Sequence, residues 1–126
     1  MKILIVEPNK APYESFLDYN LEAMQKIVGG NIEVVNLEQN TALVCNEEGK
    51  LDGLEGNRRV GHDVIAGTFF IVGDNNEGEF ISLTDEQISN YHKRFKDSEE
   101  ISSEEVEDSI YIEVCTLDEG EWEMEI

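Results

Sequence analysis

The most apolar stretch of this 126-residue chain is Val64-Ile65-Ala66-Gly67-Thr68-Phe69-Phe70-Ile71-Val72. Its β-branched and aromatic residues predict a central, buried strand, in which Gly67 allows a bulge or a close backbone approach. Three further apolar runs predict strands at Lys2 to Glu7, Ile32 to Leu37 and Thr41 to Cys45. A disordered acidic protein would lack such runs, so the chain is expected to have a folded core.

Two helices are predicted from the signals at their ends. Asn20 can cap a helix that Gly29-Gly30 ends, and this helix has an apolar face made of Leu21, Met24, Ile27 and Val28. A capping box at Thr84-Asp85-Glu86-Gln87 opens a second helix that ends near Lys96. The apolar face of the second helix consists of Ile88, Tyr91 and Phe95.

The connections are predicted from glycine, proline and polar residues. Asn9 to Asp18, which contains Pro12, predicts a loop, and Leu51 to Gly61 predicts an ordered loop with three glycines. Polar turns are predicted at Asn46 to Lys50 and at Gly73 to Glu79.

Acidic residues are concentrated near the C-terminal end. The formal net charge is −20, and Asp97 to Ile126 contain thirteen of the 29 acidic residues and no Lys or Arg. Such a surface attracts basic partners over about 8–10 Å in physiological salt. Because nucleic-acid binding depends on Lys and Arg, nine such residues against 29 acids argue against direct binding to nucleic acid. The same charge would repel an anionic membrane surface.

The acidic C-terminal part also shows a period of two. Ile110, Ile112 and Val114, and later Trp122, Met124 and Ile126, alternate with other residues around the turn Asp118-Glu119-Gly120, which predicts a β-hairpin. Ser98 to Asp108 is either a short helix or a loop. The predicted fold is therefore α+β, a mixed β-sheet with two helices packed on it and a C-terminal β-hairpin. We expect a core domain at residues 1–97 and an acidic extension at residues 98–126 packed on the core.

Six segments between Met1 and Phe95 together resemble a known family. They are Ile3-Leu4-Ile5-Val6-Glu7-Pro8, Glu22-Ala23-Met24-Gln25, Ile27-Val28-Gly29-Gly30, Ala42-Leu43-Val44-Cys45-Asn46-Glu47-Glu48-Gly49, Ile65-Ala66-Gly67-Thr68-Phe69-Phe70-Ile71-Val72-Gly73 and Leu83-Thr84-Asp85-Glu86-Gln87. In this order they resemble a small domain-of-unknown-function family carried by phages and conjugative elements of Gram-positive bacteria. The resemblance implies an accessory protein of a mobile element and brings no site residues. The acidic extension departs from the family pattern.

One cluster of basic and acidic residues is a candidate ligand loop. Arg58-Arg59 with His62-Asp63 could hold a phosphate bidentately and orient a proton-transfer pair. The alternative is that the arginines neutralise neighbouring acids and His62 caps a strand.

Metal sites and catalysis have weaker support. Cys45, Cys115, His62 and His92 lack the spacing of a zinc site, and the cysteines are expected to be small buried hydrophobic residues. A disulfide or a metal role is the alternative for the cysteines. Asp74 to Glu79 departs from a calcium loop, because its glycine is at the fifth position and Asp85 stands at the twelfth. We therefore expect no metal, no cofactor and no enzymatic activity.

The charge and the resemblance together suggest an inhibitor of a host defence nuclease, either a CRISPR effector or a restriction enzyme. The protein would occupy a basic nucleic-acid-binding surface of its target and block DNA loading, in the cytoplasm of a bacterial host. The alternatives are a sponge that sequesters a small nucleotide signal with the candidate ligand loop, or a non-enzymatic regulatory protein of the mobile element. The predicted partner-binding residues are acidic: Glu99, Glu100, Glu104, Glu105, Glu107, Asp108, Glu121, Glu123 and Glu125.

Overall fold

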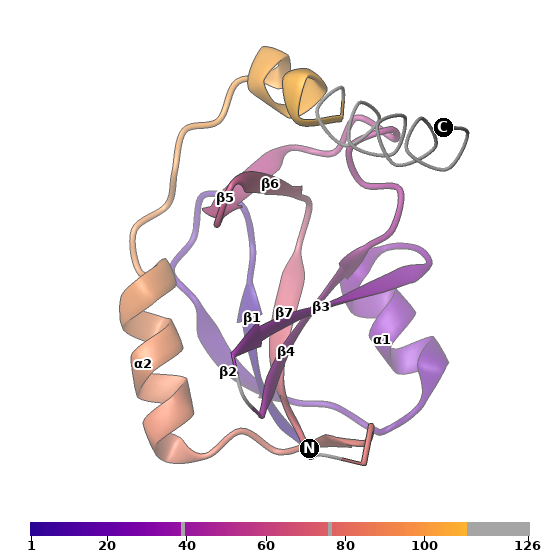
Figure 1. The fold of residues 1–126 in the computed structure, drawn as a ribbon, viewed down its shortest axis with the longest axis vertical. Helices are drawn as coiled ribbons and strands as arrows, with labels where there is room; N and C mark the ends of the chain where they lie inside the picture. Colours follow the sequence, from indigo (N-terminus) through magenta and orange to yellow (C-terminus); the bar gives the residue numbers. More distant parts are fainter. Residues whose placement is uncertain (39, 76, 111–126) are drawn as a thin grey trace, which may run out of the picture.

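The computed structural model describes residues 1–38, 40–75 and 77–110. A six-stranded sheet forms the centre, with five of its strands in the order β2-β1-β7-β4-β3 (Figure 1). The sixth strand, β8, also pairs with β7. The strands of this sheet are β1 (Lys2–Val6), β2 (Tyr13–Phe16), β3 (Ile32–Glu38), β4 (Thr41–Asn46), β7 (Phe69–Asp74) and β8 (Phe80–Ile81). Every pairing between described strands is antiparallel, so the sheet predicted to be mixed has no parallel pair there.

Each face of the sheet is covered by a helix. On one face, α1 (Leu21–Val28) packs against apolar residues of β1, β4 and β7. On the other face lie α2 (Asp85–Phe95) and part of a two-stranded sheet made of β5 (Gly56–Val60) and β6 (Asp63–Ala66). The α+β class is confirmed. A third helix covers residues 103–110, so the predicted number of two helices is wrong.

The helix caps agree with the prediction. The Asn20 side chain accepts a hydrogen bond of 2.8 Å from the Ala23 amide, and Gly29 ends α1 in the left-handed conformation. At α2, both bonds of the capping box between Thr84 and Gln87 are present. Capping signals are local, which is why they could be read without knowledge of the tertiary structure.

Two predicted loops contain strands. Within Asn9 to Asp18, β2 pairs with β1, although only one of its four residues is partly buried and the other three are exposed. Within Leu51 to Gly61, β5 pairs with β6. An edge strand can be held by backbone hydrogen bonds on one side alone, so it need not show the apolar alternation by which strands are recognised.

The apolar stretch that predicted one central strand forms two strands in different sheets. Gly67 separates β6 from β7 with φ of +83°, a left-handed conformation that favours glycine. A Cβ there would also approach Leu54 Cδ1 to 2.7 Å. The second half of the stretch, β7, is the predicted central strand, since β1 and β4 flank it and its residues Phe69, Phe70, Ile71 and Val72 are fully buried.

The remaining boundaries are close to those predicted. The strands β1, β3 and β4 match the three other predicted strands within one residue at each end. Ser98 to Asp108, whose sequence predicts either a short helix or a loop, is irregular up to residue 102 and helical from residue 103. Ile110 is helical and so does not begin a hairpin strand; the rest of the predicted hairpin lies outside the described residues. No helix among the described residues is long and apolar enough to span a membrane.

Candidate functional site

Two consecutive arginines on β5 point in different directions. The register between β5 and β6 shifts between Gly56 and Arg58, which places a bulge at Asn57. A bulge re-aims side chains that would otherwise alternate. As a result, Asn57 and Arg58 are both buried, while Arg59 is exposed.

Arg58 is enclosed by neutral oxygen acceptors. Its guanidinium donates to the Phe95 carbonyl at 3.2 and 2.9 Å, and to the Lys10 carbonyl at 2.7 Å. It also donates to the backbone carbonyl of Asn57 at 3.0 Å and to Asn57 Oδ1 at 2.8 Å. Asn57 Nδ2 in turn donates to the carbonyls of Val6 and Gly67. This network joins β5 to β1, to the corner before β7 and to the end of α2.

The surroundings of Arg58 favour a structural role. Phe95 is the last residue of α2, where carbonyls lack helical partners and the macrodipole is negative, so the guanidinium caps that helix. Burial lowers the pKa of Arg58, an effect that the nearby charges of Glu99 and Asp97 oppose. A phosphate could reach Arg58 only by displacing these buried hydrogen bonds.

Arg59 clamps the segment that follows α2. Its side chain donates to Glu99 Oε1 at 2.8 Å, and to both carboxylate oxygens of Glu105 at 2.8 and 2.7 Å. The Arg59 amide also donates to Glu99 Oε2 at 3.0 Å. Hydrogen bonds to Glu105 and Glu99 raise the pKa of Arg59, and the hydrogen bond to Arg59 lowers the pKa of Glu105. The alternative interpretation, in which the arginines neutralise neighbouring acids, therefore describes Arg59 correctly.

Apolar contacts complete the attachment of this segment. Val106 and Ile101 pack against Val64 and Ala66 of β6. A Cβ on Gly56 would come within 2.7 Å of Ile101, so glycine allows the segment to lie directly on β5. Residues 97–110 are thus fixed to the β5-β6 sheet by one small apolar cluster and one arginine.

The helix at 103–110 has an anchored side and an acidic side. Ser102 Oγ accepts a hydrogen bond of 3.1 Å from the Glu105 amide, as an N-cap does. Val106 and Ser109 are buried, whereas Glu104, Glu107 and Asp108 are exposed. Spacings of three and four residues place these three carboxylates on one helix face.

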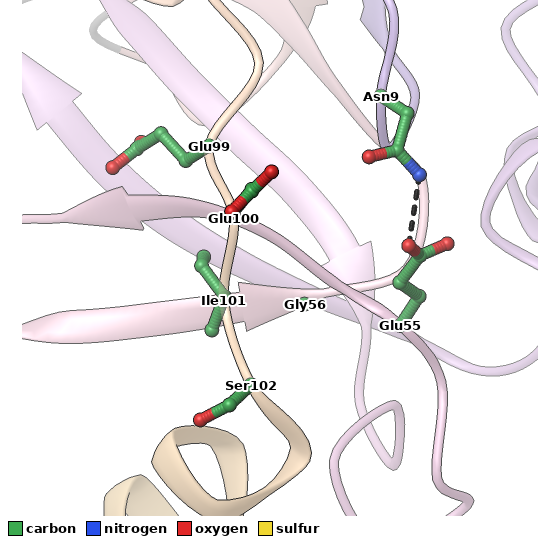
Figure 2. Close-up of a pocket in the computed structure, with 7 residues that line it drawn as sticks. All are labelled: Asn9, Glu55, Gly56, Glu99, Glu100, Ile101 and Ser102. Carbon is green, nitrogen blue, oxygen red and sulfur yellow. Dashed lines mark hydrogen bonds between the residues drawn. The ribbon is translucent and has the colours of Figure 1, made fainter.

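A hollow of about 380 Å³ lies beside the start of this segment (Figure 2). Three carboxylates line it, those of Glu55, Glu99 and Glu100, together with Asn9, Gly56, Ile101 and Ser102. Asn9 Nδ2 donates to Glu55 Oε1 at 2.8 Å, as the dashed line in Figure 2 shows. The hollow extends the acidic surface from the helix toward β5.

The four residues of the candidate ligand loop do not converge on one site. Arg58 is buried, Arg59 faces the acidic segment, and His62 is exposed in the two-residue turn between β5 and β6. Asp63 forms an ion pair with Lys50 and accepts a hydrogen bond from the Val64 amide. A nucleotide would find the two guanidinium groups already bonded on different sides of β5.

Candidate metal ligands are not gathered in the described part of the chain, where no group of three His, Cys, Asp or Glu side chains could hold an ion. Cys45 is buried in the core, as predicted, and Cys115 lies outside the described residues.

Asn75 closes the turn predicted at Gly73 to Glu79, because its side chain accepts hydrogen bonds from the amides of Glu77 and Glu79.

The predicted partner-binding residues are divided among three settings. Glu99 and Glu105 bind Arg59, and Glu100, Glu104, Glu107 and Asp108 are exposed. Glu121, Glu123 and Glu125 lie outside the described residues.

Two local signals in the sequence indicate elements that the prediction missed or left open. Ser102 followed three residues later by Glu105 is typical of a helix start, and Gly61-His62 is typical of a two-residue hairpin turn.

A family model described as "Domain of unknown function (DUF3846)" matches residues 1–96. No curated protein and no solved structure matches the chain. The matched region contains the six-stranded sheet, the β5-β6 sheet, α1 and α2, and it ends immediately before the acidic segment. Since the match covers well over half of the sequence, this chain belongs to the DUF3846 family of domains of unknown function.

Proposed function

We propose that this protein is a non-enzymatic inhibitor, encoded by a phage or another mobile element, that binds the basic nucleic-acid-binding surface of a host defence nuclease. The observation that carries the proposal is the acidic segment at residues 97–110, whose carboxylates form an acidic face. There, seven acidic residues and no Lys or Arg occupy fourteen positions. By occupying a groove that normally holds DNA, such a face would block DNA loading.

The position of the carboxylates supports a binding role over a purely solvating one. Like charges four residues apart destabilise a helix, so repulsion between Glu104 and Asp108 opposes formation of the 103–110 helix. The segment is nevertheless held against β5 and β6 by Ile101, Val106 and the Arg59 clamp. A docked helix presents its charges in a fixed arrangement, which a basic groove can match at a lower entropic cost than a mobile tail.

Most of this charge is available for a partner. Within the described residues, Arg59 forms ion pairs with Glu99 and Glu105 and with no other acid. Among the described residues, no Lys or Arg forms an ion pair with the other five acids of the segment, which are Asp97, Glu100, Glu104, Glu107 and Asp108. DNA carries about one charge per 1.7 Å of helix axis, so a groove built for DNA would attract such a face over about a Debye length.

The proposal is tested by capture followed by competition. The full-length protein, immobilised, is incubated with bacterial lysate at low salt, and retained proteins are identified by mass spectrometry. We expect a DNA-binding nuclease, released by high salt and by added duplex DNA. Neutralising Glu100, Glu104, Glu107 and Asp108 together, as Gln and Asn, should weaken its binding about 10-fold or more, while single substitutions should each have a much smaller effect.

A matched variant separates position from total charge. Changing Glu22, Glu77, Glu79 and Glu86 to Gln removes the same charge from exposed sites outside the acidic segment. This variant should retain most of the affinity for the captured nuclease. Equal weakening by both variants, or equally tight binding to DNA-loaded nuclease, would refute occupation of the nucleic-acid groove.

A further inference from the structure

The strand β2 forms one edge of the central sheet. Its inner neighbour is β1, and no other described strand pairs with it. The opposite edge, β3, has a bulge between Asn36 and Glu38, a feature that commonly protects an edge from further pairing. The register between β2 and β1, by contrast, is regular over all four residues of β2.

The hydrogen bonds beside β2 show which of its backbone groups face outward. Met1 and Leu17 exchange two bonds of 2.8 Å, so they form a hydrogen-bonded pair. In an antiparallel ladder such pairs alternate with pairs whose backbone groups point away from each other. Accordingly, Lys2, which is opposite Phe16, donates to Ser82 Oγ and accepts from the Leu83 amide, on the side away from β2.

This alternation leaves Glu14 and Phe16 with outward-facing N–H and C=O groups. Glu14 is opposite Leu4, two positions along from the pair of Lys2 and Phe16. Backbone groups at every second residue are what an added antiparallel strand would bond. By this alternation the backbone groups of Glu14 and Phe16 point away from β1, and outside the β1-β2 ladder they make no hydrogen bond to the described residues.

The side chains at the same positions specify a partner. Because they are two residues apart on a strand, Glu14 and Phe16 lie on one face of the sheet. Phe16 is 78% exposed, the highest value among the exposed large hydrophobic residues in the described part of the chain. A partner strand could cover this ring with an apolar residue and pair Glu14 with a cation, since facing residues of these kinds stabilise sheets.

We propose that the open edge of β2 binds an extended segment of another protein as an added antiparallel strand, with an apolar residue opposite Phe16 and a Lys or Arg opposite Glu14. In an antiparallel partner the residue facing Phe16 comes first, so the segment reads apolar, any residue, basic. A second copy of this chain is disfavoured as the occupant, because each copy carries a net charge of −20. The inference is independent of the acidic face.

The first test is hydrogen exchange of the free, full-length protein at low concentration. The Glu14 and Phe16 amides should exchange rapidly, and those of Tyr13 and Ser15, which face β1, should exchange slowly. Protection of Glu14 and Phe16 in the free monomer would overturn the proposal, because the chain would already cover its own edge. Protection that appears only at high protein concentration would overturn it in favour of self-association.

The second test uses two short fluorescently labelled peptides in which every second residue is threonine. The two peptides differ from each other at a single residue. One contains Phe-Thr-Lys and the other Phe-Thr-Glu, and their binding is followed by fluorescence anisotropy. The Lys peptide should bind about tenfold tighter, and Glu14→Lys should reverse this preference, whereas Glu77→Lys, outside β2, should not. Failure of both peptides to bind at millimolar concentration, or an unchanged preference in Glu14→Lys, would overturn the proposal.

A backbone variant completes the design. Glu14→Pro removes an outward N–H without removing a bond to β1, so the fold should persist while Lys-peptide binding falls at least about tenfold. Circular dichroism checks the fold of this variant, and wild-type affinity in a folded Glu14→Pro protein would contradict strand addition. If the proline variant does not fold, the Glu14→Lys comparison decides the question.

Discussion

The central sheet and the acidic segment at residues 97–110 are held in place by different means. The central strands β1, β4 and β7 are buried on both faces, and the α1 and α2 sides of the sheet each have a large apolar cluster. The acidic segment rests on the small cluster that Ile101 and Val106 form with β6, and on the clamp of Arg59. The core is therefore stabilised by two large apolar clusters, while the segment is attached by one small apolar cluster together with the solvent-exposed ion pairs of Arg59.

The two arginines of β5 illustrate this difference at adjacent positions. Arg58 is 1% exposed and donates to neutral oxygens, whereas Arg59 is exposed and bridges two carboxylates. The residue type is the same, and the bulge at Asn57 determines which arginine serves the core and which serves the segment. The following substitutions separate the two roles.

The largest effect is expected for Arg58→Ala. It would leave the Phe95 carbonyl and Asn57 Oδ1 without their Arg58 donor in a buried site, and it would also remove the donor of the part-buried Lys10 carbonyl. Each unsatisfied buried acceptor costs about 1–3 kcal/mol, so the free energy of unfolding should fall by more than about 3 kcal/mol. Urea unfolding monitored by circular dichroism measures this change.

Arg94→Ala is the matched control for that experiment. Arg94 precedes Phe95 and lies over its ring, with 5.1 Å between the guanidinium carbon and the ring centroid, but it is exposed. Its loss should cost less than about 1 kcal/mol. If Arg58→Ala were no more harmful than Arg94→Ala, the network around Arg58 would not stabilise the core.

A smaller effect is expected from ending the chain at Asp97. Neither large apolar cluster includes a described residue beyond Phe95, so we predict that the shortened protein still folds. Loss of the burial of Ile101 and Val106 should lower its stability by about 2–4 kcal/mol. Circular dichroism and thermal melting give the result. An unfolded fragment would mean that the predicted boundary at residue 97 is wrong and that the segment belongs to the core.

The smallest effect on global stability is expected for Arg59→Ala, because its ion pairs are solvent-exposed. Its melting temperature should change much less than that of Arg58→Ala, while the amides of residues 99–110 should exchange faster. Arg59→Lys keeps the charge but cannot bind two carboxylates in the same geometry, so it should give an intermediate result. Unchanged exchange in Arg59→Ala would show that Ile101 and Val106 hold the segment without the clamp.

Much of the fold could be predicted because its signals are local. The caps at Asn20 and Thr84 and the apolar runs of β1, β3, β4 and β7 needed no knowledge of distant residues. The strand β2 was missed because its backbone pairing with β1 is the main evidence for it. The corner at Gly67 was missed because an apolar stretch predicts burial and does not reveal a change from one sheet to another.

Composition and short-range patterns are enough to establish the excess of acidic residues, their concentration after residue 96, and the α+β class. Which of these charges remain available to bind a partner depends on the tertiary structure. A bulge turns Arg58 inward and leaves Arg59 to bind Glu99 and Glu105, so the candidate ligand loop is divided and part of the acidic segment is neutralised. The bulge depends on how β5 pairs with β6, and the ion pairs of Arg59 join residues about forty positions apart, which come close only when the chain folds.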